Sequence, residues 1–271
     1  MGRTLYLNEN SNINVTRDGP SVWIQWCSGS GQRVPARLIS RVVIIGNVKL
    51  EAGAITLFTE NDIPVVFLTK SGEEVAVALP YNHKLPTHYE EQKVFLETAE
   101  NSQRFENWAN TKRMVIQVSI MRRLYRKSSY KFKFGFGEGN YQKLLSPFKP
   151  RSEDKWTAVT NVINNLFRLL IIEHLIKAGL DLHMGVIHRR HNFGLALDIC
   201  YIMGGESDLQ AIKFFRCAES DHIEKISGNW TLTDKGMRNI IQRFENRKVA
   251  LHNIVSSIID EIFELMRQLR T

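Results

Sequence analysis

Residues 39–73 read ISRVVIIGNVKLEAGAITLFTENDIPVVFLTKSGE, and this stretch changes its hydrophobic period twice. RVVIIG is a short β-branched run of the kind that forms a strand, whereas EAGAITLFTEND carries Ala54, Leu57 and Phe58 at helical spacing. IPVVFLT returns to an apolar strand, and SGEE turns the chain into VAVAL. The stretch therefore predicts a strand, a short helix and two further strands.

The residues before this stretch have the pattern of further strands. Short runs rich in β-branched and aromatic residues (TLYLN, INVTR, SVWIQWC and RVPARLI) are separated by turn clusters such as NENSN, RDGP and SGSGQ. Within one run, Val22, Ile24 and Trp26 alternate with Trp23 and Gln25, which is typical of a strand with one buried face. We predict a β-sandwich-like or β-roll domain over residues 1–79, followed by a proline-containing linker at 80–89.

From residue 90 onward the hydrophobic period becomes helical. The fold class predicted is therefore α+β, with a small N-terminal β-rich domain and a larger all-α domain at 90–271. Residues 128–154 are interrupted by glycine and proline and predict a loop or hinge, and Gly179 is placed to end a long helix. The helices predicted are 90–110, 114–127, 156–178, 195–203, 231–248 and 249–270.

The positive charge of the chain is concentrated in its second part. The net charge is +8, yet residues 1–90 carry eight basic and eight acidic residues, whereas 112–155 carry twelve basic and three acidic ones. Such clustering favours a polyanionic partner, with nucleic acid ahead of a membrane surface. The alternative is ordinary solubilising charge on exposed helices.

Cysteine content and hydropathy bear on the compartment. Cys27, Cys200 and Cys217 lie far apart, which predicts free thiols rather than disulfides or a zinc site. No signal-peptide pattern and no run of about 18 apolar residues is present, so we expect a cytoplasmic protein without a membrane span.

Three residues are candidates for chemistry. The stretch GVIHRRHNFGLALDIC (185–200) runs into the apolar segment LALDICYIM (195–203), in which Asp198 is the one charged residue. A buried carboxylate needs a partner, which is either a structural donor or a metal ion. His188 is either an ordinary histidine or a ligand, since imidazole and carboxylate together suit Mn²⁺. Glu138, between glycines in FGFGEGNY, is either a salt-bridge partner for nearby cations or a metal-bound carboxylate.

Several stretches in order resemble a known family. They are LYLNENSNINVTRDG, the 39–73 stretch, GEGNY, NNLFRLLIIEHLIKAGLDLHMGVIH followed by LALDI, and WTLTDKGMRNIIQRFENRK. Together they are similar to the CRISPR spacer-acquisition integrase, the first-numbered and near-universal Cas protein. The resemblance covers most of the chain, although each motif alone is short.

This resemblance implies a dimerising N-terminal β domain and a catalytic helical domain. It implies a Mg²⁺- or Mn²⁺-dependent DNA endonuclease and integrase, which joins spacer DNA to a repeat array by 3′-hydroxyl attack on a phosphodiester. The implied partners are double-stranded DNA, a second copy of the chain and a small ferredoxin-like subunit. The implied metal and catalytic residues are Glu138, His188 and Asp198, and the residues expected to hold the DNA backbone are Arg122, Arg123, Arg126, Lys127, Lys131, Lys133, Arg189 and Arg190.

The chain departs from the family pattern after Asp198. The family usually has a second acid three residues later, followed by Phe-Arg-Pro, but this chain has Tyr201 and then IMGG. Either Asp198 serves alone, or Glu206 or Asp208 replaces the missing acid. Two further hypotheses remain: a catalytically degenerate, dimeric DNA-binding scaffold, and an unrelated nucleic-acid-binding protein.

Overall fold

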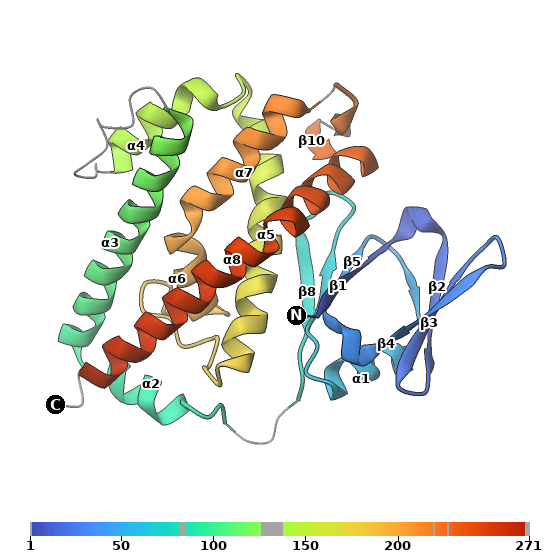
Figure 1. Cartoon of the computed structure of the whole chain (residues 1–271), viewed down its shortest axis with the longest axis horizontal. Coiled ribbons are helices and arrows are strands. Elements are labelled where there is room, and N and C mark those ends of the chain that lie inside the picture. Colours follow the sequence, from blue (N-terminus) through green and yellow to red (C-terminus); the bar gives the residue numbers. More distant parts are fainter. Residues whose placement is uncertain (1, 82–84, 126–137, 219, 227, 269–271) are drawn as a thin grey trace. The chain divides into compact units, whose positions relative to one another are not determined.

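The chain divides into two compact units, Met1–Leu85 and Pro86–Thr271, in a computed structural model. The structure describes all residues except 1, 82–84, 126–137, 219, 227 and 269–271. The α+β class predicted from the sequence is confirmed, because strands fill the first unit and helices dominate the second (Figure 1).

The first unit contains two four-stranded sheets. In one, the order is β1-β5-β7-β8, with β1, β5 and β7 parallel and β8 antiparallel to β7. In the other, the order is β4-β3-β2-β6. The strands are β1 (Arg3–Asn8), β2 (Ile13–Asp18), β3 (Ser21–Trp26), β4 (Gly31–Pro35), β5 (Ile39–Ile45), β6 (Lys49–Leu50), β7 (Val65–Leu68) and β8 (Glu74–Ala78).

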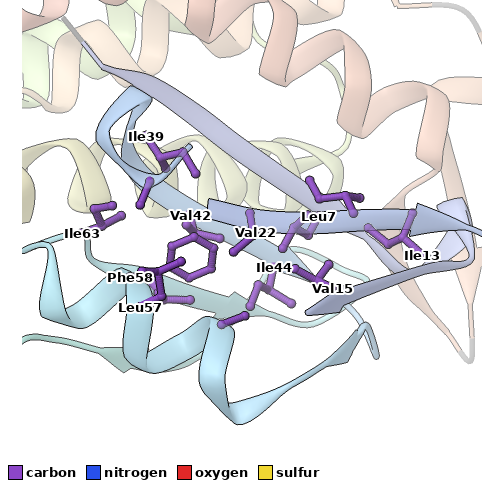
Figure 2. Packing of buried hydrophobic residues seen from close by; sticks show 14 residues of the cluster. Leu7, Ile13, Val15, Val22, Ile39, Val42, Ile44, Leu57, Phe58 and Ile63 are labelled. Carbon is purple, nitrogen blue, oxygen red and sulfur yellow. The ribbon is translucent and has the colours of Figure 1, made fainter. Parts of the chain in front are cut away.

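The 39–73 stretch forms the centre of this unit, as its periodicity predicts. All seven residues of β5 are buried, and helix α1 (Ala52–Glu60) crosses from β6 towards the parallel strand β7. Leu57 and Phe58 of α1 belong to the same cluster of buried apolar residues as Val42 of β5 and Val15 of β2, all of which Figure 2 labels. One apolar cluster therefore includes residues of both sheets and the helix between them.

The second unit is a helical bundle with one β-hairpin. Its long helix α5 (Glu153–Lys177) packs against α6, α7, α8 and strand β10, and most of its apolar residues are buried. By length and composition α5 resembles a membrane span, but it is the core helix of this unit. The other elements are α2 (Tyr89–Leu96), α3 (Ala99–Leu124), α4 (Glu138–Leu145), α6 (Gly194–Ile202), α7 (Gly204–Cys217), β9 (Ile223–Ile226), β10 (Asn229–Leu232) and α8 (Asp234–Gln268).

Two predicted helix divisions and one predicted loop are corrected by the structure. The chain breaks near 97–98 and then continues as one helix, α3, because no glycine or proline interrupts 99–124 and Thr98 caps its start. The two helices predicted at 231–248 and 249–270 are one helix, α8, whose residues after Gly236 include neither glycine nor proline. The predicted 128–154 loop contains α4 and the 3₁₀ turn Ser146–Phe148.

Glu261 of α8 fastens that helix to α3. Its carboxylate accepts hydrogen bonds from the Trp108 indole at 3.0 Å and the Lys112 ammonium at 2.6 Å. Partial burial of Glu261 opposes its ionisation, but the hydrogen bonds from Lys112 and Trp108 outweigh that effect and lower its pKa. The folded state therefore favours the ionised carboxylate.

We expect Glu261→Gln to lower the free energy of unfolding by about 1 kcal/mol at pH 7, since the pair is partly solvent-exposed. A lowered folded-state pKa stabilises the fold above the unfolded-state pKa, and this contribution disappears as the pH falls through the folded-state value. Urea unfolding at pH 7 and at pH 3 measures both effects. Glu264→Gln, at an exposed ion pair on the same helix, is the control, and an undiminished difference at pH 3 contradicts the assignment.

Candidate functional site

The candidate site is built around a fully buried carboxylate, that of Asp198 in α6. Its Oδ2 accepts the backbone N–H groups of Val186 at 2.6 Å and Ile187 at 3.2 Å. Its Oδ1 accepts the backbone N–H of His188 at 2.9 Å and the His188 ring Nδ1 at 2.7 Å. Because Asp198 has no exposed surface, these four hydrogen bonds replace the water that an ionised carboxylate loses on burial.

Two glycines allow the 183–194 loop to fold over the start of α6. A Cβ on Gly185 would lie 2.4 Å from the Gly194 carbonyl carbon, and a Cβ on Gly194 would lie 2.7 Å from the His188 carbonyl oxygen. Phe193, just before α6, has a φ of 60°. The backbone is therefore close enough to Asp198 for three successive N–H groups to reach it.

The carboxylate also orients His188. With Nδ1–H donated to Asp198, the neutral ring presents its Nε2 lone pair away from the carboxylate. The side chain of His188 is 30% exposed, and no other hydrogen bond to its ring is found in the described part of the chain. His188 is therefore a positioned, accessible imidazole, of the kind used for proton transfer or for metal ligation through Nε2.

The position of the missing acid is filled by an aromatic contact. The Tyr201 hydroxyl donates to Asn110 Oδ1 at 2.7 Å, and Arg113 donates to the Tyr201 carbonyl at 2.5 Å. The Arg113 guanidinium also lies 4.2 Å from the centre of the Tyr201 ring. Tyr201 therefore joins α6 to α3 and offers no carboxylate to a ligand.

The backbone of Glu138 begins a short helix, α4, and its side chain lies outside the described residues. Helix α4 is tied to the C-terminal end of α3 by the hydrogen bond from the Tyr125 hydroxyl to the Leu144 carbonyl. The loop of His188 is tied to the other end, where Arg189 donates to the Leu96 carbonyl in α2. Figure 1 shows α4 and α2 at opposite ends of α3, while Tyr141 of α4 also contacts Asp208 of α7.

The three-residue metal site expected from the resemblance stays a prediction, because the side chain of Glu138 lies outside the described residues. Asp198 has no exposed surface, and both its oxygens accept hydrogen bonds from the loop that carries His188. Among the described residues, no group of three or more His, Cys, Asp or Glu side chains is placed to hold a metal. The implied Mg²⁺ or Mn²⁺ centre therefore remains an expectation of the resemblance, and the steps proposed below use only His188 and Asp198.

Glu206 and Asp208 do not replace the missing acid at the His188 loop. Glu206 is 3% exposed and is bound by Arg247 through both of its oxygens, at 3.1 and 3.2 Å, and by Arg123 at 3.4 Å. Asp208 accepts the hydroxyl of Tyr141 at 2.8 Å. Both acids are therefore engaged elsewhere in the bundle.

The predicted DNA-binding cations fall into three groups. Arg122, Arg189 and Arg190 are exposed on the second unit, and Arg123 is exposed but contacts Glu206. Two cations that the sequence did not predict, Lys213 of α7 and Arg247 of α8, also lie near Glu206. The remaining expected cations, Arg126, Lys127, Lys131 and Lys133, lie outside the described residues.

Comparison with known proteins agrees with the sequence resemblance. Residues 5–135 match the family model described as CRISPR associated protein Cas1. A Cas1 protein from Thermotoga maritima has the same fold, with a TM-score of 0.80, 15% identity, and coverage of 98% of this chain and 97% of that one. No curated protein sequence matches.

Two further structures share the fold. A casposase bound to integration product has a TM-score of 0.72 and 19% identity, with 91% of this chain and 82% of that chain covered. A chain of a Cas6-RT-Cas1–Cas2 complex has a TM-score of 0.74 and 13% identity. The match covers 99% of this chain and 35% of that much longer one.

Asp198→Asn tests the central carboxylate. The amide presents an NH₂ group to N–H donors and cannot replace both oxygens, so we expect a loss of about 2–4 kcal/mol in the free energy of unfolding. Urea unfolding followed by circular dichroism measures the loss. Asp181→Asn on the same loop, where Asp181 accepts one N–H from His183, is the control, and equal effects of the two changes would argue against the role given to Asp198.

Proposed function

We propose that this chain, which matches the Cas1 family over residues 5–135 and has the Cas1 fold over nearly its whole length, is a DNA integrase and nuclease of CRISPR adaptation. The observation that carries the proposal is the His188–Asp198 pair, in which a buried carboxylate fixes an accessible imidazole. A solved relative with this fold is bound to an integration product, which supports the same class of reaction here.

His188 acts as the proton acceptor or donor of the strand-transfer step. When a DNA 3′-hydroxyl attacks a phosphodiester, one P–O bond forms, another breaks, and the hydroxyl proton must leave. The Nε2 atom of His188 accepts this proton and then returns it to the departing 3′-oxygen. Asp198 holds the ring in the required tautomer and stabilises the imidazolium that forms in between.

DNA is held by contacts to its backbone. Arg122, Arg189 and Arg190 are exposed cations that can neutralise phosphates of the DNA backbone. Contacts to phosphates carry no sequence information, so we expect binding without sequence preference. The first unit is proposed to join two copies of the chain, and a small ferredoxin-like subunit is the proposed partner in the cytoplasm. A solved relative is part of a complex that contains Cas2, which supports the partnership.

A second function, a DNA-binding scaffold without chemistry, is favoured by specific observations. Tyr201 stands where the family has an acid, and its hydroxyl is occupied by Asn110. Asp198 is fully engaged by its own loop. A chain of this kind keeps the fold and its DNA-holding cations while losing the strand-transfer step.

A strand-joining assay separates the two functions. The full chain is incubated with a short 3′-hydroxyl duplex and a supercoiled plasmid carrying a repeat array, with Mg²⁺, with Mn²⁺ and with EDTA. We expect His188→Ala to lower the joining rate 10²- to 10⁴-fold, because a positioned acid–base group contributes about that much. His191→Ala, at the neighbouring exposed histidine of the same loop, is the matched control and should stay within a few-fold of wild type.

The outcomes decide between the proposals. Joining that persists at the wild-type rate in His188→Ala removes His188 from the mechanism. DNA binding without joining in the wild-type chain under all three conditions favours the scaffold.

A further inference from the structure

A separate concentration of positive charge lies between α3, α7 and α8. At its centre is the buried carboxylate of Glu206, which contacts Arg247 of α8 and Arg123 of α3. Two further cations, Lys213 of α7 and Arg243 of α8, lie near these two arginines. We define this set as the Glu206 cluster: Glu206, Arg123, Lys213, Arg243 and Arg247.

The cluster contains more positive charge than its carboxylate balances. Burial lowers the pKa of Lys213, and repulsion from Arg247, Arg123 and Arg243 lowers it further. Of the charges that act most strongly on Lys213 in the described chain, Glu206 is the one that raises its pKa. The cluster therefore contains four cations and one carboxylate, and two of the cations, Arg123 and Arg247, contact that carboxylate directly. Repulsion between neighbouring cations raises the free energy of the protein without a bound anion, and a bound anion reduces this repulsion.

Unpartnered donors accompany this charge. Gln210 lies on the same face of α7, four residues after Glu206 and three before Lys213, and is 5% exposed. Its Nε2 atom and the Nε atom of Arg247 are buried and have no hydrogen-bond partner among the described residues. Gln210 and Arg243 also line a small cavity with Ile163, Ile240 and Phe244. A group that only accepts hydrogen bonds would satisfy these donors.

We propose that the Glu206 cluster binds a phosphate group. Phosphate oxygens accept hydrogen bonds without donating any, and arginine guanidinium groups match them in geometry. The group belongs either to a DNA backbone or to free inorganic phosphate, and naming DNA rests on the proposed function. Glu206 holds Arg123 and Arg247 in place, so that Arg243 and Lys213 complete the anion site.

The first experiment measures DNA binding by the full chain. The double variant Lys213→Gln/Arg243→Gln leaves the Glu206–Arg247 pair intact and removes two cations. The matched control, Arg104→Gln/Arg267→Gln, removes two cations that are exposed and paired within their own helices. Fluorescence anisotropy with a short duplex of random sequence over a range of NaCl concentrations gives the slope of log K against log[salt].

If the cluster holds DNA phosphates, the double variant should reduce the magnitude of this slope by about 0.9 for each phosphate that is no longer neutralised, and should weaken binding several-fold at low salt. The control should keep the wild-type slope. Lys213→Gln alone is used if the double variant does not fold, as judged by circular dichroism, and its slope should change by about half as much. These measurements require no strand joining, so they stand or fall independently of His188→Ala.

The second experiment identifies free phosphate. Sodium phosphate should raise the Tm of the wild-type chain above its value in NaCl of equal ionic strength, and the double variant should not respond. A changed salt slope assigns the site to the DNA backbone, and a phosphate-dependent Tm with an unchanged slope assigns it to free phosphate. An unchanged slope and an unchanged Tm response in the double variant overturn the proposal.

Discussion

The local structure of the candidate site depends on the burial of one negative charge, that of Asp198. An ionised carboxylate without exposed surface must recover its lost hydration through hydrogen bonds, and here the donors are three consecutive backbone N–H groups and one imidazole. These donors reach Asp198 because Gly185 and Gly194 allow their backbones to cross closely. The loop conformation and the orientation of His188 therefore have one common cause.

The burial of the Asp198 carboxylate also determines what α6 contributes to the site. Both oxygens of Asp198 accept hydrogen bonds from its own loop, so this residue acts on the site through the orientation of His188. The next candidate position in α6 is Tyr201, which instead stacks under Arg113 and hydrogen-bonds to Asn110. Both positions of this helix thus serve the packing of the bundle, and Asp198 leaves His188 oriented and partly exposed.

The sequence predicted the β domain well because its strands alternate or are continuously apolar, and these patterns survive without knowledge of neighbours. The burial of Val22 and Ile24 against the exposure of Trp23 and Gln25 follows that alternation. Asp198 was also conspicuous as a charge in an apolar run. Its role was not predictable, because its partners are mostly backbone N–H groups, which every residue except proline has. The partners of Glu206 come from helices that are distant in sequence, so residue spacing carries no record of them.

The chain itself places the two charged regions of the second unit close together. Asp198, which holds His188, lies in α6, and Glu206 follows it by eight residues at the start of α7. Eight helical residues span about 12 Å, because each adds a rise of about 1.5 Å. The Glu206 cluster is therefore close enough to the His188 loop for one short stretch of DNA backbone to contact both.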